Sequence, residues 1–297
     1  MKIVASSSGE RLDVYISCEY EQLSRSQISK LIKNKNILVN GSSVKSGYNI
    51  KEGDIIEINY EENPMDVVPE KMDLDIVYED EDVIVVNKSN GVVVHPAAGN
   101  NHGTLVNGLM YYSNNLSDIN GEFRPGIVHR IDAYTTGLLM VAKNNKAHEI
   151  LAKQLEEKTT TRVYYALVWG VINNDTGTID APIGRDINDR KKMAVTDLNS
   201  KKAVTHFKVL ERYKNATLIE LRLETGRTHQ IRVHMNYIGY PVVNDPVYGR
   251  RKLIDSTGQC LHAKTLGFIH PTIGEYMEFT SDLPDCFINI LNKLKNE

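Results

Sequence analysis

Cysteine is scarce in this sequence, and its three copies stand too far apart to indicate a shared site. Cys18, Cys260 and Cys286 are odd in number, which fits neither a disulfide framework nor a zinc cluster. Reduced thiols are therefore expected, and with them a cytoplasmic location. The first residues lack the apolar segment of a secretory signal, and no apolar run approaches the roughly 18 residues that a membrane span needs.

Three nucleotide-handling motifs are also missing. The sequence contains no Gly-x-Gly-x-x-Gly, no P-loop and no Asp-Phe-Gly, so nothing in it points to a dinucleotide enzyme, an NTPase or a protein kinase. His229 and His234 stand five residues apart, whereas two metal ligands on one helical face are usually four apart. We therefore expect no cofactor and no metal site.

An excess of positive charge is absent too, since the formal net charge is −3. Nucleic-acid binding usually leaves a basic footprint, so the average argues against such a partner. The charge is unevenly divided, however: residues 11–51 hold seven Lys or Arg against three acids, residues 52–82 hold thirteen acids and one Lys, and residues 185–234 hold twelve basic residues against six acidic ones. Because a partner responds to local potential, two basic segments leave RNA binding open.

The length of 297 residues suits two domains. Residues 1–59 form the first predicted unit, residues 60–71 an acidic, proline-containing linker, and residues 72–297 the second unit. In the first unit, Ser24 is a good helix N-cap, after which Ile28 and Ile32 fall on one helical face while Lys30 and Lys33 fall on the other. One face of this helix can pack, and the other can meet phosphate.

Strand patterns dominate the second unit. Segments rich in β-branched and aromatic residues cover 83–86, 92–94, 163–168, 204–210 and 217–223, and helical patterns cover 146–157, 228–238 and 287–294. The expected fold class is α+β, with a mixed, largely antiparallel central sheet and flanking helices, preceded by a small α+β domain.

One polar turn presents a single carboxylate. Residues 129–137 read His-Arg-Ile-Asp-Ala-Tyr-Thr-Thr-Gly, between apolar stretches at 124–128 and 138–142 that we predict to be strands. Asp132 is thus expected on a loop that buried strands anchor. From spacing alone it could be a nucleophile, a general base, a metal ligand or a turn residue that accepts backbone hydrogen bonds.

These nine residues resemble the His-Arg-Leu-Asp-x-x-Thr-Ser-Gly signature of the RluA-type pseudouridine synthases, with Ile131 for Leu and Thr136 for Ser. Other segments are similar to that family in the same order: 83–88, 91–96, 164–170 (Tyr-Tyr-Ala-Leu-Val-Trp-Gly), 224–234 (Glu-Thr-Gly-Arg-Thr-His-Gln-Ile-Arg-Val-His), 239–241, 245–249 and 261–263. The N-terminal unit resembles the S4 RNA-binding module through residues 11–13, 24–28, 38–41 and 53–54.

The resemblance implies an enzyme that isomerises uridine to pseudouridine in structured RNA without a cofactor. It implies that Asp132 is the essential carboxylate, that Arg227 pairs with it and that Tyr164 stacks on the target base. Arg130 matches a residue that enters the gap left by the extruded base, and His129 is expected to orient the loop beside the RNA. The S4 resemblance adds four candidate RNA contacts, namely Arg25, Lys30, Lys33 and Lys35.

The substrate implied by an S4 domain on this catalytic unit is large-subunit ribosomal RNA, free or in a pre-ribosomal particle, bound by a monomer that needs no membrane. A synthase acting on tRNA and a non-catalytic RNA-binding or ribosome-assembly protein are the alternatives, and a glycosidase would need a second carboxylate. The sequence departs from the family at Ala133 and Tyr134, where a Lys-Asp or Lys-Glu pair is common, and at Ser89, where Pro often stands. These departures concern RNA contact beside the site rather than a catalytic group.

Overall fold

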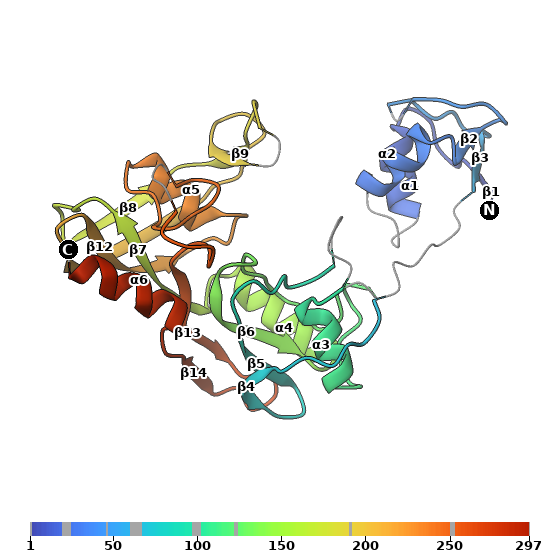
Figure 1. The fold of residues 1–297 in the computed structure, drawn as a ribbon. Coiled ribbons are helices and arrows are strands. Elements are labelled where there is room, and N and C mark those ends of the chain that lie inside the picture. The colour runs from blue at the N-terminus through green and yellow to red at the C-terminus, as the bar shows by residue number, and fades with distance from the viewer. Residues whose placement is uncertain are drawn as a thin grey trace. The chain divides into compact units, whose positions relative to one another are not determined.

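The computed structural model describes residues 2–19, 25–45, 47–59, 67–96, 102–121, 124–189, 192–249 and 253–296, apart from the side chains of 18, 19, 25–27 and 30. The candidate residues Arg25 and Lys30, and Cys18, thus have side chains outside the described set. The chain divides into two compact units, residues 1–66 and 67–297 (Figure 1).

The N-terminal unit packs two helices on a small antiparallel sheet. Strands β1 (Lys2–Val4), β3 (Ile55–Ile58) and β2 (Ile37–Val39) pair in that order, next to α1 (Leu12–Glu19) and α2 (Arg25–Lys33). Ile28 and Ile32 of α2 are buried in this core, which confirms the packed face that the sequence predicts. Lys33 at the end of α2 and Lys35 just after it are exposed.

The larger unit is built on a nine-stranded mixed sheet in the order β4-β5-β6-β13-β7-β12-β11-β8, with β14 paired to β13. All of these pairings are antiparallel except β6 with β13. The predicted α+β class is therefore confirmed. The strands span β4 Asp75–Glu79, β5 Val83–Lys88, β6 Thr136–Ala142, β7 Thr161–Trp169, β8 Thr176–Asp180, β11 Val204–Arg212, β12 Ala216–Leu223, β13 Leu261–Ile269 and β14 Tyr276–Thr280.

The middle of this sheet is held by a short parallel contact that we call the seam. At the seam, β13 pairs with β6 at two positions only, His262 with Thr136 and Ala263 with Gly137, before β13 turns to pair with β14. Gly137 has a φ of 106°, and a Cβ atom there would overlap the backbone of Ala263. Glycine ends the 129–137 motif because the two backbones approach too closely for a side chain.

Helices cover the sheet and a small hairpin stands apart from it (Figure 1). Helix α4 (Asn145–Glu156) contacts β6 and β13, and α5 (Gln230–Tyr237) contacts β11 and β10. Strands β9 (Ile183–Arg185) and β10 (Met193–Val195) form the two-stranded hairpin. The other helices are α3 (Leu105–Tyr112), which begins with a capping box between Thr104 and Asn107, and α6 (Asp285–Lys295).

Three predictions at element level were wrong. Residues 92–94 are not a strand, because the carbonyls of Val93 and Val94 accept hydrogen bonds from the first two N–H groups of α3. Residues 124–128 form a turn that touches the sheet through one isolated bridge, Ile127 to Val141.

Residues 67–71 were assigned to the linker, but they lie in the larger unit, because Asn107 hydrogen-bonds the backbone of Val68 and Glu70. The remainder of the predicted linker, 60–66, is outside the described residues. In the part of the chain that the structure describes, no helix is long and apolar enough to cross a membrane.

Candidate active site

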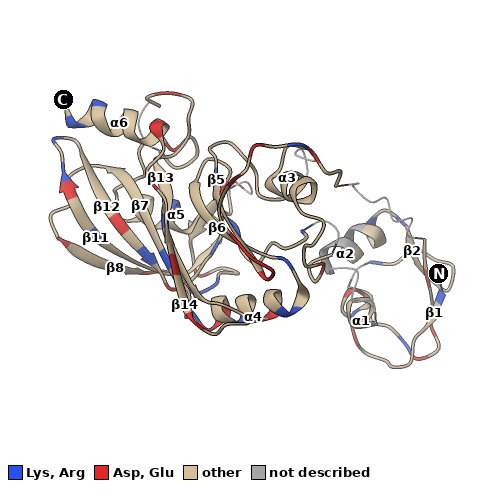
Figure 2. Ribbon diagram, turned by 90° about the horizontal axis from the view of Figure 1, so that it is seen from below, with Lys and Arg blue, Asp and Glu red and all other residues tan. Residues whose placement is uncertain are grey.

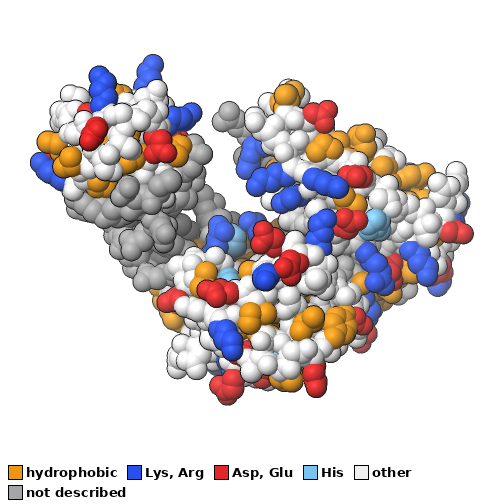
Figure 3. All heavy atoms as spheres, turned by 180° about the vertical axis from the view of Figure 1, so that it is seen from behind, with side chains coloured by type: hydrophobic (Ala, Val, Ile, Leu, Met, Phe, Trp, Pro, Cys, Tyr) orange, Lys and Arg blue, Asp and Glu red, His pale blue; other side chains and the backbone are white. Residues whose placement is uncertain are grey.

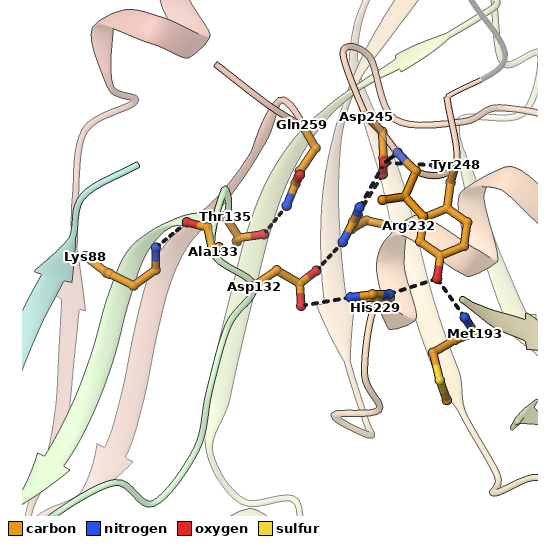
Figure 4. Close-up of polar contacts among 11 residues, drawn as sticks. Lys88, Asp132, Ala133, Thr135, Met193, His229, Arg232, Asp245, Tyr248 and Gln259 are labelled. Carbon is orange, nitrogen blue, oxygen red and sulfur yellow. Dashed lines mark hydrogen bonds and ion pairs between the residues drawn. The ribbon is translucent and has the colours of Figure 1, made fainter. Parts of the chain in front are cut away.

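The Asp132 loop is closed by its own backbone and fastened to the end of β5 beside the carboxylate. The Thr135 N–H donates to the Asp132 carbonyl at 3.0 Å, which closes a tight turn. Next to Asp132, the carbonyl of Ala133 accepts from the Lys88 ammonium at 2.8 Å (Figure 4). Lys88 is 2% exposed at the end of β5 and also donates to the carbonyls of Ser89 and Val92. Three carbonyls therefore match the three donors of one ammonium.

The hydroxyls of this loop serve structure rather than substrate. Thr135 Oγ1 accepts from the Gln259 amide at 3.1 Å, and Thr136 Oγ1 lies 2.8 Å from His262 Nδ1. His262 Nε2 in turn lies 2.9 Å from Ser281 Oγ, so this buried chain ties β6 to β13 at the seam. Burial lowers the pKa of His262 to about 4, which keeps the imidazole neutral near neutral pH.

His129 is hydrogen-bonded to the strand that follows the motif. Its Nε2 accepts the N–H of Met140 in β6 at 3.1 Å, so in the neutral imidazole the proton lies on Nδ1. Burial, together with the charge of Arg162, lowers the pKa of His129 to about 3. A proton-transfer role near neutral pH does not fit such a group, whereas an anchor that links the start of the motif to the next strand does.

The counter-ion of Asp132 is Arg232 and not Arg227. Arg232 Nη1 donates to Asp132 Oδ2 at 2.9 Å, while Nε and Nη2 of the same guanidinium donate to the two oxygens of Asp245 at 2.7 and 2.9 Å (Figure 4). Arg232 Cζ also lies 5.0 Å from the centre of the Tyr248 ring. The guanidinium therefore bridges the partly buried carboxylate of Asp132, which is 19% exposed, to the fully buried one of Asp245, with little rotational freedom.

The electrostatics of this bridge are set by Asp245. Its side chain is fully buried, and Oδ1 also accepts the N–H groups of Val247 and Tyr248. Burial works against ionisation of Asp245, but the bonds from Arg232 outweigh it and lower its pKa. Burial likewise disfavours charge on Arg232, yet Asp245 and then Asp132 raise its pKa above the ordinary arginine value. Both groups are therefore charged at neutral pH.

The local backbone explains why the predicted pairing was wrong. His229 takes the left-handed conformation, with φ at 57°, and α5 begins only at Gln230. Arg232 is consequently in the first turn of the helix and points at the loop, whereas Arg227 lies on the preceding segment, exposed, with Nε donating to the carbonyl of Lys202. Asp245, three residues before Tyr248, also favours Arg232 over Arg227, because a buried carboxylate needs a cation beside it.

A chain of polar contacts continues from the free oxygen of Asp132. His229 Nε2 is 3.9 Å from Asp132 Oδ1, His229 Nδ1 is 2.8 Å from the Tyr248 hydroxyl oxygen, and that oxygen accepts the N–H of Met193 in β10 at 2.9 Å (Figure 4). From the sequence, His229 is not expected to bind a metal ion, and no other role is predicted for it.

The predicted catalytic residues share one pocket. Its volume is about 340 Å³, and Asp132, Tyr164 and Arg227 line it together with Arg130 and His129. Tyr164 is 7% exposed on β7. Burial raises the pKa of its phenol, with Arg162 lowering and Asp132 raising it further, so the hydroxyl stays protonated. Three cations that are not the counter-ion of Asp132 also line the pocket, namely Arg130, Arg162 and Arg227.

The basic excess of residues 185–234 is partly neutralised in the fold. Arg222 pairs with Glu220 on β12, and Arg212 on β11 pairs with Asp175. Basic and acidic residues share these strands (Figure 2), and the visible face of the larger unit mixes both signs (Figure 3). The cations of the pocket are therefore a local feature and not part of a uniformly basic surface.

The family departures at Ser89, Ala133 and Tyr134 fall around the loop. The carbonyls of Ser89 and Ala133 accept from Lys88, which any residue type allows. Tyr134 packs on Gly258, where a Cβ would lie 2.5 Å from the Tyr134 Cβ. Its side chain is therefore part of the contact between the Asp132 loop and the segment before β13.

Comparison with known proteins identifies the family. The family model for RNA pseudouridylate synthase matches residues 82–237, and the S4 domain model matches residues 10–56. The chain belongs to the RNA pseudouridylate synthase family. The larger unit therefore carries the family's catalytic region, and the N-terminal unit is an S4 domain. Both predictions from the resemblance are confirmed, and so is the enzyme class, RNA pseudouridine synthase.

Relatives match nearly the whole chain. An RNA pseudouridine synthase of Bacillus subtilis is 56% identical over 96% of this chain and 94% of its own length. The ribosomal large subunit pseudouridine synthase D of Pseudomonas aeruginosa is 42% identical over 97% of this chain and 93% of its own. Among solved structures, human RNA pseudouridylate synthase domain containing 1 is 26% identical with a TM-score of 0.60, covering 80% of this chain and 98% of that one.

The described residues contain no group of three or more His, Cys, Asp or Glu side chains placed to hold a metal ion. His234, one of the two histidines that could suggest such a site, is buried between Thr205 Oγ1 and the carbonyl of Ala181.

Proposed function

We propose that this synthase isomerises uridines of large-subunit ribosomal RNA, with Asp132 as the carboxylate on which cleavage of the glycosidic bond depends. The observation that carries the proposal is the asymmetric environment of Asp132 in the pocket. Arg232 binds Oδ2 at 2.9 Å, whereas the polar contact recorded for Oδ1 among the described residues is His229 Nε2, at 3.9 Å. One oxygen is thus held and the other is open to a substrate.

The Arg232 bridge suits a site that closes over RNA. Once RNA displaces water from the pocket, an isolated carboxylate would be strongly destabilised, and a hydrogen-bonded cation offsets that cost. Asp245 keeps the guanidinium in place from the opposite side. Asp132 therefore has a counter-ion whose position does not depend on the substrate.

The target uridine must leave its stack to reach Asp132, at a cost of a few kcal/mol. Tyr164 offers an aromatic surface for the extruded base in the same pocket. Arg130 is exposed at the rim of the loop, and its planar guanidinium suits the space that the base leaves. Arg227 and Arg162 line the same pocket, and their positive charge suits contact with backbone phosphates.

The choice of ribosomal RNA rests on the relatives and on the S4 domain. The Pseudomonas aeruginosa relative is named for the large ribosomal subunit, and similarity to it covers both units. The exposed Lys33 and Lys35 suit phosphate contact in the S4 domain. A monomer working on ribosomal RNA or a pre-ribosomal particle in the cytoplasm is the arrangement we propose.

Asp132→Asn tests the catalytic role. The amide keeps the size of the side chain and Asp245 still holds Arg232, so the variant should fold and bind RNA with normal affinity while forming no pseudouridine. Asp282→Asn, which alters a fully exposed acid of the same unit, is the matched control and should act like the wild type. Pseudouridine formation by Asp132→Asn at the wild-type rate would refute the role.

Mapping pseudouridines in all RNA from a strain that lacks the protein tests the substrate. We expect loss at one or more sites of large-subunit ribosomal RNA, restored by the wild-type gene and not by Asp132→Asn. A loss confined to tRNA would overturn the ribosomal proposal while leaving the role of Asp132 intact.

A further inference from the structure

The contacts of Tyr248 fix where its hydroxyl proton lies. The Met193 N–H is a donor, so the Tyr248 oxygen must accept from it at 2.9 Å. Among the described residues, His229 Nδ1 is the partner left for the hydroxyl, 2.8 Å away. Burial raises the pKa of Tyr248, so the phenol keeps its proton at neutral pH. The hydroxyl therefore donates to His229 Nδ1.

That donation sets the tautomer of His229. A neutral imidazole has one N–H, and a ring nitrogen that accepts a hydrogen bond cannot carry it. The proton must then lie on Nε2, the nitrogen 3.9 Å from Asp132 Oδ1. Burial lowers the pKa of His229; Arg232 and Arg130 act in the same direction, and Asp132 and Asp245 oppose them. The net effect favours the neutral ring.

We infer that His229 is a positioning residue for Asp132, presenting Nε2–H to the open oxygen Oδ1, and that Tyr248 holds His229 in the tautomer that does so. The inference rests on the proposed role of Asp132. Arg232 then donates to Oδ2 and His229 faces Oδ1, so each oxygen of Asp132 has a donor on its own side. The carboxylate therefore keeps one rotamer while RNA enters. Without the Tyr248 hydroxyl, the ring can place a lone pair towards the carboxylate, which repels it.

The same contacts reach the β9–β10 hairpin. Met193 is the first residue of β10, and its N–H donates the hydrogen bond that orients the Tyr248 hydroxyl. Tyr248 also packs edge-on against His229, with ring centres 5.6 Å apart. The β9–β10 hairpin thus supports the orientation of His229 through Tyr248, although Asp132 is on a loop of the large sheet and the hairpin is not part of that sheet.

Tyr248→Phe is the decisive variant, because it removes one oxygen and keeps the ring. We expect the single-turnover rate of pseudouridine formation to fall about tenfold, the effect of one buried hydrogen bond in a charged network, while the RNA dissociation constant changes less than twofold. Tyr78→Phe is the matched control, since it removes a tyrosine hydroxyl that donates to Asp80 at 2.7 Å in the same unit; its rate should equal that of the wild type.

Two further measurements separate positioning from general support. His229→Gln offers an amide N–H towards Asp132 and should retain more activity than His229→Leu, with both variants binding RNA normally. In ¹⁵N NMR spectra of the wild-type protein, the His229 signal, assigned by its loss in His229→Gln, should show the proton on Nε2, and Tyr248→Phe should shift the ring towards a mixture of tautomers.

A proton on Nδ1 in the wild type would overturn the inference, and so would a wild-type rate for Tyr248→Phe. Because Asp132→Asn is measured in the same assay, the two proposals can be told apart. An inactive Asp132→Asn beside a fully active Tyr248→Phe refutes only the role of His229. An active Asp132→Asn refutes the role of Asp132 itself.

Discussion

The two halves of the large sheet make different contributions to the pocket. Strands β4 to β6 carry the acid, because Asp132 precedes β6 and Lys88 at the end of β5 holds its loop. The half that begins at β13 carries the cation and the aromatic groups, since Tyr164 is on β7 and Arg232 is on α5. The halves meet at the seam through two residue pairs.

The difference shows where the site is preorganised. Arg232 keeps two of its hydrogen bonds within its own half, through Asp245, and sends one across to Asp132. The position of the Arg232 guanidinium is therefore set within its own half of the sheet, whereas the position of Asp132 depends on the seam and on Lys88. Substitutions of Arg232 should reduce both stability and activity, while substitutions at the seam should change how the two halves of the sheet pack against each other.

The largest expected effect comes from Arg232→Gln. It leaves the buried Asp245 without its cation, so the free energy of unfolding should fall by about 3–5 kcal/mol, and pseudouridine formation should be lost in whatever protein remains folded. Denaturant unfolding and a single-turnover assay measure the two effects. Arg227→Gln, the matched control, alters an exposed guanidinium and should unfold like the wild type while weakening RNA affinity. An unfolding free energy of Arg232→Gln equal to that of Arg227→Gln would refute the stabilising role of Arg232.

Gly137→Ala tests the seam. The new Cβ would overlap Ala263, and φ at 106° strains any side chain, so we expect a loss of about 2–4 kcal/mol in unfolding free energy. Gly121→Ala is the control, because φ is 72° there but nothing lies within 4 Å of the added carbon. It should cost about 1 kcal/mol. Similar losses for the two would mean that the close approach of β6 and β13 is unimportant.

A smaller effect should follow from pH, through His262 at the seam. Burial lowers its pKa from 6.5 to about 4, so between these values the unfolded chain binds a proton that the folded protein does not. The unfolding free energy should therefore fall as pH drops from 6.5 to 4, with a contribution from His262 of about 3 kcal/mol. His262→Gln should reduce this slope, and the part that remains should come from other histidines such as His129, whose pKa burial lowers to about 3. An unchanged slope in His262→Gln would refute the contribution of His262.

Much of the fold and the acid of the site could be predicted from sequence, for reasons that are local. Ile28 and Ile32 recur at helical spacing, and the face that they predict is buried. Asp132 stands out because a polar turn interrupts apolar residues, and Tyr164 is found in the same pocket. Ordered motifs then identified the family where periodicity alone could not.

What the sequence concealed depends on a few backbone angles and distant partners. Arg227 and Arg232 are both cations near the start of a helix, and only the left-handed turn at His229 decides which one faces Asp132. The valines at 92–94 have strand propensity, but their carbonyls cap α3. Tyr248 is sixteen residues beyond Arg232 in sequence, and its link to His229 exists only in the folded chain.

The Lys88 ammonium, surrounded by the carbonyls of Ser89, Val92 and Ala133, does for the Asp132 loop what a bound ion does for many other loops. Because this cation is tethered to the chain, it can be neither diluted away nor exchanged, and the shape of the loop should be insensitive to the ionic composition of the medium. The shape of the loop should instead be sensitive to deprotonation of Lys88, since burial lowers the pKa of Lys88 to about 7.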